Sequence, residues 1–216
     1  GKQVSLPEIG LGDAKPHERD APRVSSEVIR CPKCGGPLAL AAPDKSERVT
    51  CPNCRSLLDV TQGNLSFFRA LEPSPVENAF VLPVGAEGNF PGDVKFKIIG
   101  AMARSVTIDG ERYFWQEYLL YNPMIGFRWL VHSDNHWNFV ESVNTADVES
   151  TGNYSGCTAT YNGEKYKIFQ DATAVVEYVK GEFYWRVEQG KSVQATDFVC
   201  PPRMLSREAT RDEVNW

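Results

Sequence analysis

The sequence lacks the short motifs that mark the common enzyme classes. It contains no GxSxG nucleophile elbow, no Walker phosphate loop, no GxGxxG dinucleotide loop and no HExxH metalloprotease helix. Each of these motifs supplies a specific catalytic or phosphate-binding geometry, and none of those geometries is encoded here in a recognisable form. We therefore expect a protein that is not an enzyme.

Long hydrophobic runs are absent as well. No apolar stretch approaches the roughly 18 residues that a membrane-spanning helix needs, and the N-terminus shows no signal peptide. The chain begins at Gly1 without an initiator Met. We therefore expect an excised fragment without a membrane span of its own. In the natural protein, membrane segments could flank this fragment.

A basic excess is missing too. The formal net charge is −5. Residues 23–60 carry six Lys and Arg against four Asp and Glu, a balance that an ion held by four thiolates would bring close to neutral. Proteins that bind nucleic acid usually show a basic face. Nucleic acid is therefore not the expected partner, although its binding by residues 23–60 is kept as an alternative.

Four of the six cysteines, in contrast, form a clear pattern. The chain contains Cys31-Pro-Lys-Cys34 and Cys51-Pro-Asn-Cys54, with sixteen residues between the two pairs. Two CxxC pairs at this separation are typical of a four-thiolate zinc site. The sequence therefore predicts a zinc ribbon over residues 23–60 with a structural Zn²⁺, because a closed four-cysteine site leaves no open coordination position.

The remaining cysteines, Cys157 and Cys200, show no such spacing. We expect free thiols, with a disulfide between them as the alternative. Thiolate-bound zinc and unpaired cysteines both fit a reducing compartment, so the expected location is the cytoplasm. Gly35 directly follows the first CxxC pair, where a positive φ is often required and glycine adopts it at low cost.

From residue 92 onward the chain is a series of short β-strand candidates. Apolar and polar residues alternate, as in half-buried strands. We expect turns at Asp109-Gly110, Asn162-Gly163, Lys180-Gly181 and Gln189-Gly190. Such short connections favour antiparallel pairing. The predicted fold class is therefore all-β: a small zinc ribbon followed by an antiparallel β-meander or barrel-like domain.

Changes in composition divide the chain into four segments. They are a disordered or loosely docked lead-in (1–22), the zinc ribbon (23–60), a connector (61–80) and the all-β domain (81–216). We expect loss of the metal to unfold the ribbon and to leave the β domain standing, because so small a module has too little core to fold unaided.

Two segments of the β domain resemble each other. Asp109-Gly-Glu-Arg-Tyr-Phe-Trp115 and Lys180-Gly-Glu-Phe-Tyr-Trp185 both pass from a glycine turn into an aromatic strand. An internal duplication into two related halves explains this likeness, and independent use of the same hairpin residues explains it equally well. Near the end of the chain, residues 205–213 suggest a short helix with Ser206 as its N-cap, or else a polar tail.

The aromatic residues of the β domain have two interpretations. One is packing in the core and at its rim, since each ring buries a large apolar area. The other is an exposed platform for a cationic ligand or a peptide, which the acidic β domain would favour. The candidate interaction surface consists of Trp115, Tyr118, Trp129, Trp137 and Trp185.

A hydrolase is the remaining alternative, and it depends on two histidines. His132 and His136 lie four residues apart across an expected strand, turn and strand. Glu117, Asp134 and Glu141 could join them in a metal or acid–base cluster. Nothing in the spacing requires this cluster, and exposed histidines in a turn are the simpler expectation.

Part of the chain also resembles a known family. The features concerned are Tyr113-Phe-Trp-Gln-Glu-Tyr-Leu-Leu120, Gly126-Phe-Arg-Trp-Leu130, Trp137, Gly181-Glu-Phe-Tyr-Trp185 and the segments from Asp197 to Trp216. Over roughly residues 80–216 they resemble an uncharacterised bacterial family, domain of unknown function 4178, in which an N-terminal zinc ribbon is a familiar arrangement. The resemblance implies no established activity. It implies association with membrane-stress or polyamine-related systems, so we expect a non-enzymatic interaction or scaffold protein with a protein partner.

Overall fold

The computed structural model describes residues 2–5, 8, 10, 29–61, 64–90, 92–151, 156–211 and 213–216. Most of the predicted lead-in, residues 1–22, lies outside this set. The described residues form β-strands, all of them paired antiparallel, and a three-residue 3₁₀ helix, η2 (Thr145–Asp147). The predicted all-β class is therefore confirmed.

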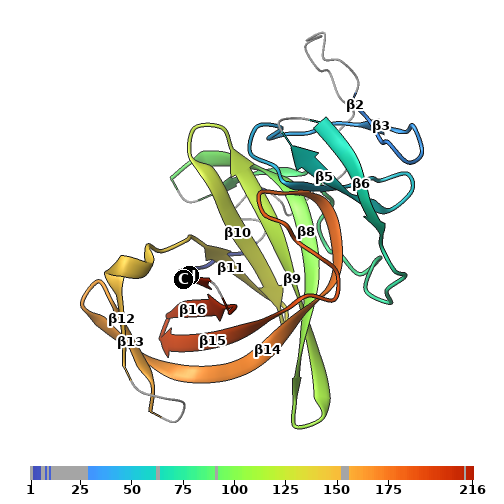
Figure 1. Cartoon of the computed structure of the whole chain (residues 1–216). Coiled ribbons are helices and arrows are strands. Elements are labelled where there is room, and N and C mark those ends of the chain that lie inside the picture. Colours follow the sequence, from blue (N-terminus) through green and yellow to red (C-terminus); the bar gives the residue numbers. More distant parts are fainter. Residues whose placement is uncertain are drawn as a thin grey trace.

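The β domain consists of two meanders joined side by side (Figure 1). The strands of the first are β7 (Glu87–Phe90), β8 (Val94–Ile108), β9 (Glu111–Asn122), β10 (Gly126–Ser133) and β11 (His136–Val140). The strands of the second are β13 (Thr158–Tyr161), β14 (Glu164–Phe183), β15 (Ser192–Cys200), β16 (Arg203–Ala209) and β17 (Val214–Asn215). Their order in the sheet is β11-β10-β9-β8-β14-β15-β16-β17. We call these strands the body.

The two meanders have the same topology. Each starts from a long strand, β8 or β14, and these two strands pair with each other at the centre of the sheet. A short strand precedes each of them, since β7 pairs with β8 and β13 pairs with β14. The remaining strands extend the edges: β1 (Lys2–Gln3) pairs with β11, and β12 (Val148–Thr151) pairs with β13. The strand order thus shows two related halves at the level of topology.

The sequence likeness that suggested two halves does not follow this topology. Asp109-Gly110 forms the turn between β8 and β9, whereas Lys180-Gly181 lies inside β14. The predicted turn at Lys180-Gly181 is therefore wrong. The counterpart of the first hairpin is the β14–β15 connection, which contains the expected turn at Gln189-Gly190.

Two of the predicted hairpin turns have the expected backbone. Asp109 and Gly110 have φ angles of 52° and 83°, and Asn162 and Gly163 have φ angles of 51° and 75°. Positive φ at both central residues defines the tight turn that matches the twist of paired strands. These two predictions are confirmed.

The predicted helix near the end of the chain is wrong, because residues 203–209 form strand β16. The Ser206 hydroxyl donates to Asp197 Oδ1 at 2.6 Å across the β15–β16 pair, and it caps no helix. Leu205 is buried while its neighbours are more exposed, which is the alternation of a strand. Pairing along β15 therefore outweighs the local N-cap signal.

The sheet curls strongly, although the described strands do not close it (Figure 1). Arg104 on β8 contacts Glu208 on β16, yet β14 and β15 lie between these strands. On a flat sheet three strand spacings alone would separate them by about 14 Å. The register places Ala172, Ala174 and Ala195 on the same face between them. These small side chains leave room for the concave face to fold over.

The N-terminal strands divide between two sheets. They are β2 (Ile29–Arg30), β3 (Pro37–Leu38), β4 (Arg48–Thr50), β5 (Ser56–Thr61) and β6 (Asn64–Ala70). Strands β2 and β3 pair with each other in a separate two-stranded sheet, whereas the other three continue the sheet of the body. We call the described residues between 29 and 70 the ribbon. Strand β4 pairs with the last residues of β14, and β5 and β6 extend the sheet beyond it. Part of the predicted connector, 61–80, is thus the third strand of the ribbon sheet.

Ribbon and body also share a hydrophobic core. Ala42, Leu57 and Leu71 from the N-terminal side pack in one buried cluster with residues such as Ile99 and Phe183 from the body. A separate cluster surrounds the cysteines within the ribbon. The ribbon is therefore joined to the body both by backbone pairing and by apolar burial.

Two glycines allow the body to approach the ribbon. Gly100 on β8 and Gly181 on β14 pair with each other, and Gly181 has a φ of 79°. A Cβ on Gly100 would lie 2.2 Å from the carbonyl oxygen of Glu182, and one on Gly181 would lie 2.2 Å from that of Ile99. Only residues without a Cβ permit this contact. The close approach lets β14 leave β8 and pair with β4.

We predict that Gly100→Ala lowers the free energy of unfolding by about 3 kcal/mol, because the added methyl group meets backbone and not a movable side chain. Gly110→Ala is the matched control. It also lies beside β8, but its Cβ would meet nothing within 4 Å, so only its positive φ is strained, at a cost of about 1 kcal/mol. Urea unfolding measures both values. An equal or smaller loss for Gly100→Ala would contradict the assigned contact.

Candidate metal centre

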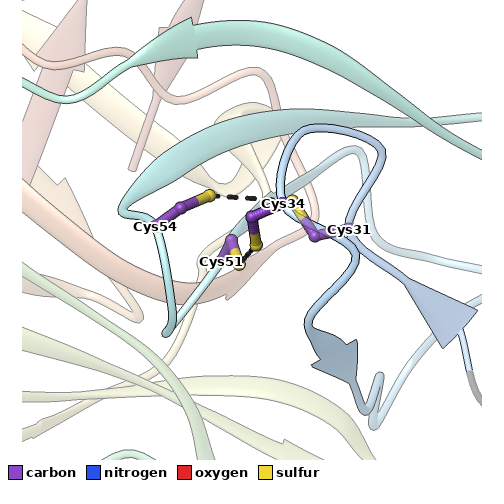
Figure 2. A group of neighbouring side chains, drawn as sticks. All are labelled: Cys31, Cys34, Cys51 and Cys54. Carbon is purple, nitrogen blue, oxygen red and sulfur yellow. Dashed lines mark hydrogen bonds between the residues drawn. The ribbon is translucent and has the colours of Figure 1, made fainter.

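The four predicted ligands converge on one point. The sulfur atoms of Cys31, Cys34, Cys51 and Cys54 all lie within 4.8 Å of one another, and Figure 2 shows them meeting from two loops. Two of the Sγ–Sγ distances, Cys31 to Cys54 and Cys34 to Cys51, are 3.7 Å. Four bonds of 2.3 Å to a tetrahedral ion would place the sulfurs about 3.8 Å apart. The arrangement therefore has the size that a bound metal ion requires.

The cysteines are not paired as disulfides. All six cysteines are free, and 3.7 Å is far longer than the bond of about 2.05 Å between disulfide sulfurs. Cys157 and Cys200 are half-buried thiols in the body, as expected from the sequence. Among the described residues no other group of His, Cys, Asp and Glu brings three ligand atoms together.

The two CxxC loops have the same backbone geometry. The amide of Gly35 donates to the carbonyl of Cys31 at 2.8 Å, and the amide of Arg55 donates to that of Cys51 at 2.9 Å. Gly35 and Arg55 both have a positive φ, 72° and 56°. The expected role of Gly35 is confirmed, while the second loop holds a non-glycine residue in the same conformation.

The pKa values of two of the thiols are shifted in opposite directions. The Gly36 amide acts to lower the pKa of Cys34, but desolvation and the neighbouring thiols raise this pKa to about 12. Desolvation acts to raise the pKa of Cys54, but contacts with Ser56 and the other thiols lower it to about 6. Four thiolates in so small a space need a cation to balance them, and a bound metal ion supplies that charge.

A buried carboxylate of the body clamps the loop between the two CxxC pairs. Glu182 is 4% exposed, and its oxygens accept hydrogen bonds from the amides of Ala41 and Ala42 at 2.6 and 3.1 Å and from the Ser46 hydroxyl at 2.9 Å. The amide of Glu47 then donates to the carbonyl of Phe183 at 2.9 Å. This carboxylate fixes the ribbon loop against the end of β14.

Two members of the candidate interaction surface belong to the core. Tyr118 is fully buried and Trp137 is 8% exposed. The Tyr118 hydroxyl accepts hydrogen bonds from the amides of Val81 and Leu82 at 2.9 and 3.2 Å. These two residues are therefore unavailable to a partner, and the expectation that they belong to an exposed surface is wrong.

The other three tryptophans of that set are partly accessible. Trp115, Trp129 and Trp185 are half-buried. Trp129 and Trp185 contact each other edge to face, with ring centroids 5.3 Å apart. Phe127 and Tyr184 stack beside them with centroids 4.5 Å apart. Contact of this set with a partner stays a prediction.

The histidines of the hydrolase alternative lie on opposite faces of the sheet. In the β10–β11 pair, His132 faces Trp137 and Ser133 faces His136, and successive pairs point to opposite sides. His132 stacks on Trp137 with centroids 4.2 Å apart, and desolvation lowers its pKa. Glu117 accepts hydrogen bonds from Arg104 and Trp115. The two histidines and Glu117 therefore form no cluster.

Sequence reasoning missed a buried ionic network on the concave face. The Arg104 side chain is 4% exposed, and its Nη1 donates to Glu117 Oε1 at 3.1 Å and to Glu208. Trp115 Nε1 also donates to Glu117, at 2.6 Å. Burial raises the pKa of Glu117, an effect that Arg104 opposes and Glu208 increases. No sequence signal indicated this network, because its members come from three strands that the curl brings together.

These features define an all-β protein in which a small four-cysteine ribbon is joined to a curled sheet. A family model described as Domain of unknown function (DUF4178) matches residues 84–216, more than half of the chain. The chain belongs to this family. No curated protein and no solved structure matches it. Within the described residues, no helix has the length and apolar character needed to cross a bilayer.

We predict that Glu182→Ala lowers the free energy of unfolding by about 3 kcal/mol, because two buried amides and a hydroxyl lose their acceptor. Amide hydrogen exchange at Ala41 and Ala42 should accelerate in parallel. Glu149→Ala, at an exposed position, is the control and should change stability by less than about 0.5 kcal/mol. Unchanged exchange at the two alanines would exclude the proposed clamp.

Proposed function

We propose that this chain is a non-enzymatic interaction protein whose ribbon is held by one structural Zn²⁺ and whose body contacts a protein partner. The observation that carries the proposal is the closed four-sulfur site. It lies within a ribbon that is too small to fold alone and that pairs through β4 with a much larger sheet. A closed site leaves no coordination position for a substrate. The metal therefore has a structural role.

Zinc fits the ligand set best. Four thiolates in tetrahedral geometry suit Zn²⁺ or iron and disfavour Mg²⁺ and Ca²⁺, which bind oxygen. Thiolate-bound metal and free thiols persist in a reducing environment, so the proposal places the protein in the cytoplasm. The family resemblance adds a bacterial membrane-stress or polyamine-related system as its setting.

Three further features support interaction over catalysis. The half-buried rings of Trp129, Trp185, Phe127 and Tyr184 form one aromatic cluster at the surface of the body, and such clusters are enriched where proteins meet. The histidines that a hydrolase would use lie on opposite faces of the sheet. Glu117, a carboxylate considered for the acid–base cluster, accepts hydrogen bonds from Arg104 and Trp115 instead.

We expect the purified protein to contain one zinc ion per chain by elemental analysis. Cys31→Ser should lose the metal, because three sulfurs no longer complete the tetrahedron. Cys157→Ser, which removes a thiol outside the site, should keep it. A predominance of iron, or equal metal loss in both variants, would contradict the assignment of a zinc site at these cysteines.

Chelation should make residues 29–70 sensitive to protease before the body is cut. Because every tryptophan lies outside the ribbon, a red shift of tryptophan fluorescence on chelation would report exposure of the shared core near Trp185. The ribbon covers that core through Ala42 and Leu57. If protease digests ribbon and body equally fast after chelation, the hypothesis that only the ribbon depends on the metal for folding is rejected.

The interaction itself can be tested with a photo-crosslinking amino acid in living cells. Placed at Trp129, it should yield a discrete cross-linked protein, because that ring belongs to the accessible aromatic cluster. The same amino acid at Phe169, which is 68% exposed on β14, is the control. Identical products from both positions would mean that the aromatic cluster is not a specific contact surface.

A further inference from the structure

We infer that the outer edge of strand β6 binds an extended acidic segment of a partner protein, which adds a strand to the ribbon sheet. This inference deepens the proposed interaction function and depends on it. It names a second contact surface, separate from the aromatic cluster of the body, and the chemistry of its ligand. Three properties of β6 carry it: an open backbone edge, exposed aromatic rings and local positive charge.

The first property is the open edge. Strand β6 (Asn64–Ala70) pairs with β5 and with no other described strand (Figure 1). An unpaired edge presents a row of amide and carbonyl groups that another extended chain can complete. Among the described strands that pair with a single neighbour, β7 and β12 also have four residues or more, but neither exposes a large hydrophobic side chain. Strand β6 is both longer and more apolar at its surface.

The second property is a pair of adjacent exposed rings. Phe67 is 49% exposed and Phe68 is 36% exposed. The β5–β6 register is irregular at this point, since Leu58 pairs with Phe67 whereas Leu57 pairs with Arg69. Phe68 is therefore an extra residue in a β-bulge of the edge strand. Apolar exposure of this kind on an edge strand normally marks a place where another chain docks.

The third property is the charge around the rings. Lys33 Nζ lies 5.2 Å from the centre of the Phe67 ring, and the Arg48 guanidinium lies 3.6 Å from that of Phe68. Arg69 adds a third cation within the strand itself. Arg48 is ion-paired with Asp59, so the positive charge around the rings comes from Lys33 and Arg69, in a chain whose net charge is −5. This positive charge favours an acidic ligand over a basic one.

Arg48 also has unused hydrogen-bonding capacity. Its side chain is 4% exposed, and its Nη1 forms an ion pair with Asp59 Oδ1 at 2.9 Å. Arg48 Nε has no hydrogen-bond partner among the described residues. A buried nitrogen without an acceptor is costly. A carboxylate entering beside Phe68 would supply one.

The test uses the zinc-loaded full chain and an acetylated, amidated heptapeptide in which Glu and Val alternate. This peptide is extended, acidic and able to pair along an edge. Calorimetric titration should show saturable binding that weakens with salt, and a peptide with Lys in place of Glu should show none. Phe67→Ser should weaken binding at least tenfold. Phe169→Ser, which removes an even more exposed ring from β14, should leave it unchanged.

Backbone pairing has its own signature. Two further peptides carry N-methyl groups on the odd or on the even amides, so that each blocks one of the two edges. One should lose binding at least tenfold and the other should retain it, because an added strand uses only one of its edges. Equal binding of both peptides would overturn strand addition. Lys33→Glu should weaken the acidic peptide at least tenfold while the zinc content stays at one per chain.

The other occupants give different results. A dimer detected by light scattering and lost in Phe67→Ser would identify a second copy as the occupant. A single-stranded oligonucleotide that binds more tightly than the peptide and is weakened by Phe67→Ser would identify nucleic acid. Either outcome overturns the acidic segment. Absence of peptide binding by a chain that keeps its zinc and its cross-link at Trp129 would reject the β6 surface alone, whereas loss of all three would reject the proposed function itself.

Discussion

The carboxylate of Glu182 is the contact on which the arrangement of this protein depends. It accepts hydrogen bonds from two amides and a hydroxyl of the ribbon loop, and it lies beside the pairing of β4 with β14. A buried carboxylate without donors would be strongly unfavourable, and buried amides without acceptors would be too. The carboxylate and its three donors therefore depend on one another. Because the carboxylate belongs to the body and the donors belong to the ribbon, these hydrogen bonds fix how the two parts are joined.

The close approach of Gly100 and Gly181 makes that contact possible. In an ordinary sheet a strand of twenty residues would stay beside its neighbour, but β14 leaves β8 at this pair and continues along β4. In the middle of β14, Ala172 and Ala174 allow the second meander to fold over the concave face, where Arg104 reaches Glu208. Strand β14 therefore belongs to two parts of the sheet that run in different directions. Glycine or alanine residues lie at both positions where the neighbours of β14 change.

Local patterns predicted the features that depend on neighbours in sequence. The CxxC spacing predicted the cluster of four cysteines, and the Asp-Gly and Asn-Gly pairs predicted two hairpins, because a few adjacent residues determine those geometries. Features that depend on distant residues were missed or wrong. Lys180-Gly181 has the composition of a turn, yet pairing with β8 and β4 keeps it within a strand. Ser206 is a residue type typical of an N-cap, but its hydroxyl donates a hydrogen bond to Asp197 on the neighbouring strand.

The four-cysteine cluster and the open edge of β6 are connected through the backbone. Strand β5 begins directly after the second CxxC loop, where the amide of Cys51 donates to the carbonyl of Ser56 at 2.8 Å. The amide of Leu71, at the end of β6, donates to the carbonyl of Arg55 at 3.1 Å. An ion that fixes this loop therefore also fixes the start of β5 and the end of β6. Strand pairing requires an ordered edge. A partner at β6 would therefore bind only the metal-loaded ribbon. The metal would then both stabilise the ribbon and be required for binding of the partner.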